Sequence, residues 1–305
     1  MSSPGCCAGL SHNADMHTHD IKDAALPSAW TELLANQDPA AVTRPQAYRL
    51  AFADPEFLLR RETRGIRMQL ELQKPDLAQM EAGIENTVVV FGSARFVSEE
   101  TAQTQLAQAQ ASGNAQALAQ AERTLRNAAW YEQARAFARI VSEQCSCLPA
   151  QEKLHICTGG GPGIMEAANR GAHDVGQPSV ALNIVLPHEQ SANPFVTPEL
   201  SFKFHYFALR KMHFMMRAKA LVAFPGGFGT LDELFEVMTL VQTRKSRPVP
   251  ILLYGRDYWQ RLLNLQVLVD EGTISADDLK LFTYVDTPQE AWQHICDFYR
   301  LPVDN

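Results

Sequence analysis

The chain has 305 residues, 46% of them hydrophobic and 20% charged, with a formal net charge of −7 and a pI near 5.7. This size suits one large or two ordinary globular domains. The acidic balance argues against general binding to a nucleic acid polymer or an anionic membrane, although a local basic pocket remains compatible with it. Because no apolar run approaches the roughly 18 residues of a membrane span and residues 1–34 lack a signal-peptide pattern, we expect a cytoplasmic protein with no membrane partner.

Cysteine and histidine usage does not indicate a metal site or a cofactor. Cys145 and Cys147 are separated by one residue rather than by the two of a zinc or redox pair. His12, His17 and His19 are better explained by a solvated tail than by metal binding, since no cysteine or carboxylate spacing matches them. We therefore expect free thiols, no metal and no bound cofactor.

The sequence of the N-terminal 80 residues predicts a segment with little regular structure followed by a helical segment. Residues 1–25 are expected to be a disordered tail, and residues 26–80 a helical N-terminal extension. A basic face within the extension is formed by Arg60, Arg61, Arg64 and Arg67. A solvated or interface face explains these arginines better than a ligand site, because charge runs usually lie in water. Residues 81–305 are expected to form a second, larger domain.

The first predicted strand of this domain is Val88–Phe91, which runs directly into Gly92 and Ser93. Such a strand end is where a doubly wound sheet keeps its ligand crevice. Beyond it, residues 97–127 are rich in Ala and Gln and are interrupted at Ser112–Asn114. We therefore expect a helical hairpin inserted after the first strand, followed by a crossover helix.

A glycine-rich turn follows the second predicted strand, His155–Thr158. The next five residues read Gly-Gly-Gly-Pro-Gly, and a helical pattern begins at Ile164. This turn lacks the Lys and Ser/Thr of a Walker A loop and the full spacing of a dinucleotide fingerprint. A kinase or an ordinary dehydrogenase is therefore disfavoured.

Five further strands are predicted, with helical patterns between most of them. They cover Ser179–Val185, Ser201–His205, Ala220–Phe224, Val249–Tyr254 and Phe282–Val285. This alternation predicts a parallel sheet covered on both faces. The expected fold class is therefore α/β: a Rossmann-like doubly wound parallel sheet with helices on both faces, together with the helical N-terminal extension and the helical hairpin insertion.

The most informative turn follows Leu221–Phe224 and reads Pro-Gly-Gly-Phe-Gly-Thr-Leu-Asp-Glu at residues 225–233. The proline ends the strand, and the glycines let main-chain N–H groups converge on a phosphate where a helix begins. The alternative is structural, because Thr230 and Glu233 have the spacing of a capping box. If Glu233 instead faces a ligand, its place near a helix N-terminus is expected to keep it ionised.

Together these motifs resemble the LONELY GUY (LOG) family of nucleoside 5′-monophosphate phosphoribohydrolases. The resemblance rests on Gly92-Ser-Ala-Arg95, Gly159–Glu166, Leu186–Gln190, Arg210-Lys211 and Pro225–Glu233, and it covers about residues 86–242. The extension and the hairpin are similar to the additions found in the long-chain branch of the family. The family is often labelled lysine decarboxylase, but no lysine here is marked as one that binds pyridoxal phosphate.

The resemblance implies hydrolysis of the N-glycosidic bond of AMP or a cytokinin riboside 5′-monophosphate to a free base and ribose 5-phosphate. It implies Arg210 and Glu233 as catalytic residues, with Glu233 either stabilising the ribosyl cation or activating water. The implied substrate contacts are Gly92, Ser93, Gly159, Gly160, Gly161, Glu189, Lys211, Gly226, Gly227, Gly229, Thr230, Asp232 and Thr239.

A non-catalytic carrier or sensor of a nucleotide or cofactor on the same fold is the alternative function. A carrier needs the glycine turns but not the carboxylate, so the presence of both Arg210 and Glu233 favours hydrolysis. The resemblance also implies paired subunits with the pocket near their interface, and a homo-oligomer is therefore expected.

Overall fold

The computed structural model describes residues 49–186 and 191–301. The chain divides into two units, Met1–Thr63 and Arg64–Asn305. In the described part of the smaller unit, a turn of 3-10 helix, η2 (Ala51–Ala53), precedes α2 (Pro55–Leu58), and the Asp54 carboxylate caps the first N–H groups of α2. The tail predicted for residues 1–25 and the first part of the predicted extension lie outside the described residues.

Within the part of the chain that the structure describes, the larger unit contains one seven-stranded sheet in which all neighbouring strands are parallel. The strands are β1 (Asn86–Phe91), β2 (Leu154–Thr158), β3 (Ser179–Ile184), β4 (Ser201–Phe204), β5 (Ala218–Ala223), β6 (Ile251–Tyr254) and β7 (Thr283–Val285). Their spatial order is β4-β3-β2-β1-β5-β6-β7. The chain therefore winds from the central β1 to one edge and then from β5 to the other, which confirms the predicted Rossmann-like α/β class.

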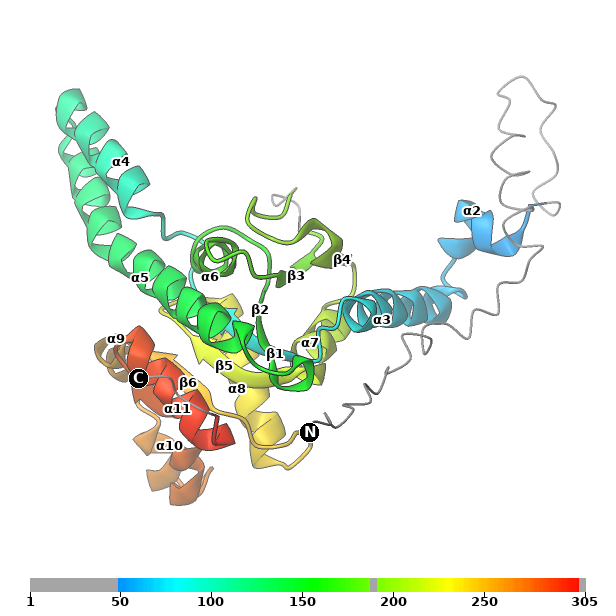
Figure 1. Cartoon of the computed structure of the whole chain (residues 1–305). Coiled ribbons are helices and arrows are strands. Elements are labelled where there is room, and N and C mark those ends of the chain that lie inside the picture. The colour runs from blue at the N-terminus through cyan, green and yellow to red at the C-terminus, as the bar shows by residue number, and fades with distance from the viewer. Residues whose placement is uncertain (1–48, 187–190, 302–305) are drawn as a thin grey trace, which may run out of the picture. The chain divides into compact units, whose positions relative to one another are not determined.

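Helices cover both faces of this sheet (Figure 1). One face packs against α5 (Ala115–Ser146), α6 (Ile164–His173) and α11 (Pro288–Tyr299), and the other against α3 (Arg64–Glu81), α7 (Phe207–Met216), α8 (Phe228–Gln242) and α9 (Arg256–Leu262). The shorter elements are η3 (Ala150–Glu152), η4 (Pro198–Leu200), α10 (Gln266–Asp270) and η5 (Ala276–Leu281). Among the described residues, no helix combines the length and the apolar character needed to cross a membrane.

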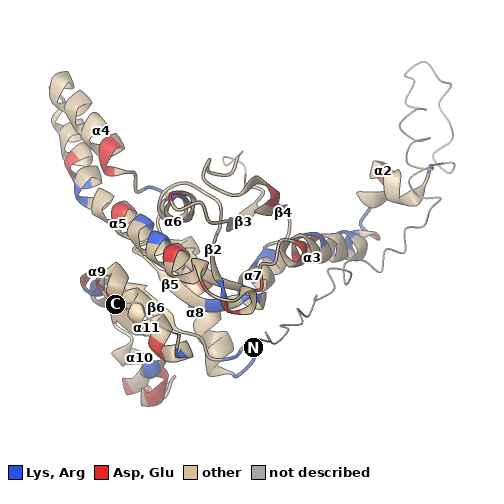
Figure 2. Ribbon diagram, in the orientation of Figure 1, with Lys and Arg blue, Asp and Glu red and all other residues tan. Residues whose placement is uncertain are grey.

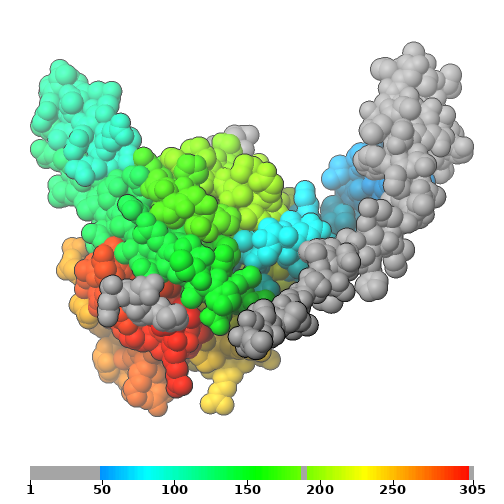
Figure 3. All heavy atoms as spheres, in the orientation of Figure 1, coloured from blue at the N-terminus to red at the C-terminus, as the bar shows by residue number. Residues whose placement is uncertain are grey.

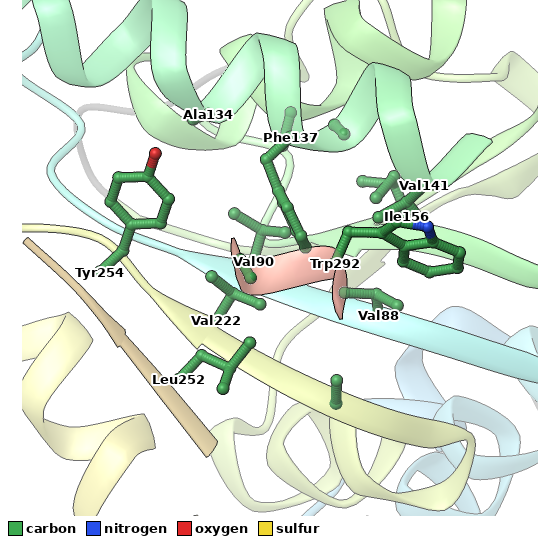
Figure 4. Close-up of a cluster of buried hydrophobic side chains, with 14 of the residues drawn as sticks. Val88, Val90, Ala134, Phe137, Val141, Ile156, Val222, Leu252, Tyr254 and Trp292 are labelled. Atoms are coloured by element: carbon green, nitrogen blue, oxygen red, sulfur yellow. The ribbon is translucent and has the colours of Figure 1, made fainter. Parts of the chain in front are cut away.

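Successive side chains of a strand point to opposite faces of the sheet, and this divides the core into two layers. In β1, Val88 and Val90 belong to the layer under α5, whereas Val89 and Phe91 belong to the layer on the opposite face. Figure 4 shows Phe137 of α5 reaching down to the strands beside Val90. Because both layers are buried, the central strands are almost continuously apolar, as a parallel sheet requires.

The predicted hairpin is confirmed, with one difference in its second arm. Its first arm, α4 (Glu99–Ser112), ends at Gly113, which has φ +66°, and the Asn114 side chain accepts hydrogen bonds from the first N–H groups of α5. The two arms extend beyond the sheet layer (Figures 1 and 3). The second arm and the predicted crossover helix are one continuous helix of 32 residues, because α5 contains neither glycine nor proline.

The predicted basic face of the extension is interrupted. Arg64 is the first residue of α3, whereas Arg60 and Arg61 lie in the bent segment that precedes it. These arginines therefore do not share one helical stripe.

Candidate functional site

The turns after β1, β2 and β5 meet at one edge of the sheet. Strands β1 and β5 are neighbours, and the chain leaves them towards opposite edges, so the gap between their carboxyl ends is the switch point of the doubly wound sheet. A cavity of about 990 Å³ lies there, which we call the switch-point cavity. Of the predicted site residues, its lining includes Gly92, Ser93, Gly159, Arg210, Gly226, Gly227, Gly229, Thr230, Asp232 and Glu233.

Hydrogen bonds tie the three turns to one another. The main-chain N–H of Ser93 donates to the carbonyl of Pro225 (3.0 Å), and the N–H of Ile164, at the start of α6, donates to the carbonyl of Ser93 (3.1 Å). A Cβ atom at Gly92 would lie 2.6 Å from the Ile164 side chain, so this position requires glycine. The turns therefore form one continuous main-chain surface beside the cavity.

The glycines after β2 have different roles. Gly159 lines the switch-point cavity, whereas Gly160 and Gly161 are not among its described lining residues. The carbonyls of Gly160 and Gly161 accept hydrogen bonds from the main-chain N–H (2.9 Å) and the side-chain amide (3.2 Å) of Asn193. These two glycines thus maintain the shape of the turn, and the structure does not place them against a ligand in the cavity.

The start of α8 decides between the two explanations of Thr230 and Glu233. The helix begins at Phe228 with Gly227 as its N-cap, and no side chain caps it. The capping-box alternative is therefore wrong, since Thr230 and Glu233 both lie inside the helix and both line the cavity. The first N–H groups of α8 point towards this edge of the sheet, where an anion can accept hydrogen bonds from them.

Glu233 is buried, with 5% of its surface exposed. Burial raises the pKa of Glu233 to about 7, although the charges of Lys211 and Arg210 act in the opposite direction. The expectation that the helix N-terminus keeps this carboxyl group fully ionised at neutral pH is therefore not met. Glu233 is the sixth residue of α8, beyond the first turn in which the helix dipole acts.

Arg210 approaches the same cavity from α7. Its Nε donates a hydrogen bond to the carbonyl of Leu182 in β3 (2.7 Å), and its guanidinium carbon lies 5.1 Å from the centre of the Phe214 ring. A side chain at Gly159 would collide with the Arg210 guanidinium, so the glycine leaves room for it. The arginine and Glu233 therefore face one cavity from α7 and α8.

Comparison with known proteins agrees with the sequence motifs. A family model described as "Possible lysine decarboxylase" matches residues 165–295. The probable cytokinin riboside 5′-monophosphate phosphoribohydrolase LOG4 of Oryza sativa subsp. japonica is 30% identical over 145 residues, which cover 46% of this chain and 61% of the relative. The probable phosphoribohydrolase LOGL5 of the same plant is 33% identical over 150 residues, covering 44% of this chain and 60% of the relative.

The chain is therefore similar in sequence to proteins of the LOG family. The match spans about three fifths of the length of these curated relatives. Among solved structures, the Moco carrier protein of Chlamydomonas reinhardtii is similar with a TM-score of 0.40 and 16% identity, covering 71% of this chain and 98% of that protein.

Besides Gly160 and Gly161, two more implied substrate contacts, Lys211 and Thr239, are not among the described residues that line the cavity. The Lys211 ammonium is bound by the carboxylates of Asp232 (2.9 Å) and Glu236 (2.6 Å). Thr239 lies on the exposed side of α8 and donates its hydroxyl hydrogen bond to the carbonyl four residues earlier (2.7 Å). Glu189 lies outside the described residues.

The switch-point cavity also contains side chains that the motifs did not indicate. Asn127 and Trp130 come from α5, near the base of the hairpin, and Tyr258 and Arg261 come from α9. The pairing of β5 with β6 brings the start of α9 to the switch point. No local motif marks these residues, so only knowledge of the strand order could have revealed them.

The mouth of the cavity contains exposed apolar side chains beside the exposed charged groups of Arg95, Asp257 and Arg261. Phe207 at the start of α7 and Phe228 at the start of α8 both line it, although they are 51% and 90% exposed. Met212 and Met216 extend the exposed apolar surface along α7. Large exposed apolar side chains grouped in this way are typical of a binding or assembly surface.

Proposed function

We propose that this chain hydrolyses the N-glycosidic bond of nucleoside 5′-monophosphates, such as AMP or a cytokinin riboside 5′-monophosphate, to a free base and ribose 5-phosphate in the cytoplasm. The observation that carries the proposal is that Arg210 and Glu233 border the same cavity as the three glycine turns. The relatives named as cytokinin riboside 5′-monophosphate phosphoribohydrolases support the same reaction.

In this proposal the phosphate binds at the N-terminus of α8. The main chain at Gly226 and Gly227 and the first N–H groups of α8 supply hydrogen-bond donors, and the positive end of the helix dipole favours the anion. Ser93, on the adjoining turn after β1, adds a hydroxyl group to the lining. The ribose then extends towards Arg210 and Glu233.

Bond cleavage develops positive charge on the sugar. Ionised Glu233 stabilises this charge or accepts a proton from the water that attacks C1′, while the Arg210 guanidinium holds the substrate and favours departure of the base. A pKa of about 7 for Glu233 suits a group that must be ionised and yet basic enough to accept a proton at neutral pH.

Decarboxylation of lysine is less well supported. None of the described residues that line the switch-point cavity is a lysine, so no side chain there can form a Schiff base with pyridoxal phosphate. Lys211, the nearest candidate in the motif, is bound by two carboxylates of α8.

We also propose that the chain works as a homo-oligomer. The exposed apolar side chains Phe207, Met212, Met216 and Phe228 lie on α7 and α8 at and beside the cavity mouth. A second copy covering this surface would remove apolar area from water and shield the site.

The proposal is tested by incubating the purified protein with AMP and isopentenyl-AMP and measuring free base and ribose 5-phosphate. We expect release by the wild type, loss of release in Glu233→Gln and Arg210→Ala, and unchanged release in Glu122→Gln, an exposed carboxylate of α5 used as the control. Equal release by wild type and Glu233→Gln would contradict the assigned role of the carboxylate. Tight binding of AMP without release would instead favour the carrier function.

A further inference from the structure

The helix that precedes the first strand packs against the helix that carries Arg210. In Figure 1, α3 lies beside α7, and Met68 and Leu72 of α3 pack against the buried cluster that contains Leu209 and Phe214 of α7. The residues that carry the LOG resemblance begin only after α3. Its contacts with α7 therefore belong to an element to which the proposed function assigns no role.

At the N-terminal end of α7, α3 supplies the cap. The Glu71 carboxylate accepts hydrogen bonds from the main-chain N–H groups of His205 and Tyr206, each at 3.1 Å. Tyr206 is the N-cap of α7, and its own side chain does not cap the helix. Glu71 thus satisfies donors that α7 leaves open and places a negative charge at the positive end of its dipole.

At the other end of α7, α3 makes a second charged contact. Arg217, the C-cap of α7, donates to the carboxylate of Asp76 (2.6 Å) and to its main-chain carbonyl (3.2 Å). The same guanidinium donates to the carbonyl of Ile84, just before β1 (2.9 Å). Acidic residues of α3 (Figure 2) therefore hold both ends of a helix of ten residues.

Between these two ends lies Arg210. Its hydrogen bond to Leu182 and its contact with Phe214 fix the side chain to β3 and to α7, so a rotation or sliding of α7 would change where the guanidinium lies in the cavity. Glu233 stands on α8, which α3 does not cap. The distance and direction between the Arg210 guanidinium and the Glu233 carboxyl group therefore depend on the position of α7 in the fold.

We propose that Glu71 is a positioning residue: by capping α7 it holds Arg210 in the orientation that the switch-point cavity requires. This inference rests on the proposed function, because Arg210 is its catalytic arginine. A displacement of about 1 Å in a group that contacts the substrate can cost up to about a hundredfold in rate. Loss of one capping carboxylate can therefore affect catalysis more than stability.

The test uses Glu71→Ala, the milder Glu71→Gln and the control Glu81→Ala, an exposed glutamate at the end of the same helix. We expect kcat for AMP to fall about tenfold or more in Glu71→Ala, less in Glu71→Gln, which keeps an acceptor oxygen, and not in Glu81→Ala. The affinity for inorganic phosphate, measured by calorimetry, should stay within about twofold, since the turns that bind it do not depend on α7.

A second measurement separates this inference from the proposed reaction. In the Glu233→Gln background, AMP affinity is compared for Glu71→Ala, Arg210→Ala and both together. Non-additive losses would support positioning through Arg210 even if the wild type released no base, in which case only the proposed reaction would fail. A folded Glu71→Ala protein with a lowered melting temperature but wild-type kcat, or additive losses in the cycle, would overturn the inference.

Discussion

The phenol of Tyr258 donates a hydrogen bond to the main-chain carbonyl of Gly226, with an oxygen to oxygen distance of 2.7 Å. This bond joins the first turn of α9 to the turn after β5, at the point where the phosphate is proposed to bind. A neutral hydrogen bond of this kind contributes about 1 kcal/mol. We therefore expect Tyr258→Phe to weaken binding of inorganic phosphate and AMP by about fivefold, because the turn loses one of its restraints.

A matched control is available at the other side of the sheet. Tyr299 donates to the carbonyl of Lys219, also at 2.7 Å, and is not among the described residues that line the cavity. Tyr299→Phe should lose a similar amount of stability without a change in phosphate affinity, as calorimetry and thermal melting can establish. Equal affinities in both variants and the wild type would show that the turn keeps its shape without Tyr258.

The pH dependence of hydrolysis should report Glu233. Burial raises the pKa of this carboxyl group to about 7, and the proposed mechanism needs its ionised form. The value of kcat/KM for AMP, which reports the ionisation of the free enzyme, should therefore increase as the pH rises through about 7 and level off above it. A series of initial rates between about pH 5.5 and 8.5 tests this expectation, and a flat profile across neutrality would contradict it.

The same raised pKa has a cost for stability. Below the pKa that Glu233 has in the unfolded chain, both the folded and the unfolded chain hold the proton, so the ionisation of Glu233 does not change the free energy of unfolding. Between the ordinary value of 4.5 and the folded value of about 7, the unfolded chain has released this proton and the folded chain still holds it, so stability falls as the pH rises through this interval and stays at the lower value above it. Glu233→Gln should therefore be more stable than the wild type by about 3 kcal/mol at pH 8 and by about 1 kcal/mol at pH 5.

Urea unfolding at these two pH values measures the difference directly. A variant that loses hydrolysis and gains more stability at pH 8 than at pH 5 would show that the carboxylate is kept for function at the expense of stability. If Glu233→Gln proves less stable at both, the carboxylate must have stabilising partners that outweigh its burial.

The sequence predicted the fold better than it predicted the electrostatics of the site. Short apolar runs, several of which end in glycine turns as Val88–Phe91 does before Gly92, are local signals, and they placed all seven strands within a few residues. The ionisation of Glu233 is not local, because it depends on how many atoms of distant segments bury the side chain. The ion pairs of Lys211 with α8 and the position of Tyr258 beside Gly226 likewise depend on helix packing and strand order, which no single motif predicts.

Lys211 offers a way to change the charge around Glu233 without replacing a residue of the cavity lining. Its ammonium group lowers the pKa of Glu233, and it also neutralises Asp232 and Glu236, which act to raise that pKa. Lys211→Gln removes the positive charge that lowers the pKa of Glu233. It also leaves the negative charges of Asp232 and Glu236 without their ion-pair partner, and both changes favour the protonated form of Glu233. The midpoint of the pH–rate profile should therefore move to higher pH, with the rate at high pH largely retained.

Lys219→Gln is the control, because this lysine lies over the Tyr299 ring (5.7 Å) and does not contribute to the pKa of Glu233. Its profile should match that of the wild type. If Lys211→Gln instead lowers the plateau at high pH and leaves the midpoint in place, Lys211 contacts the substrate itself, as the LOG motif implies. The two outcomes differ in which part of the curve changes, so a single set of rates across neutral pH distinguishes an electrostatic role from direct binding.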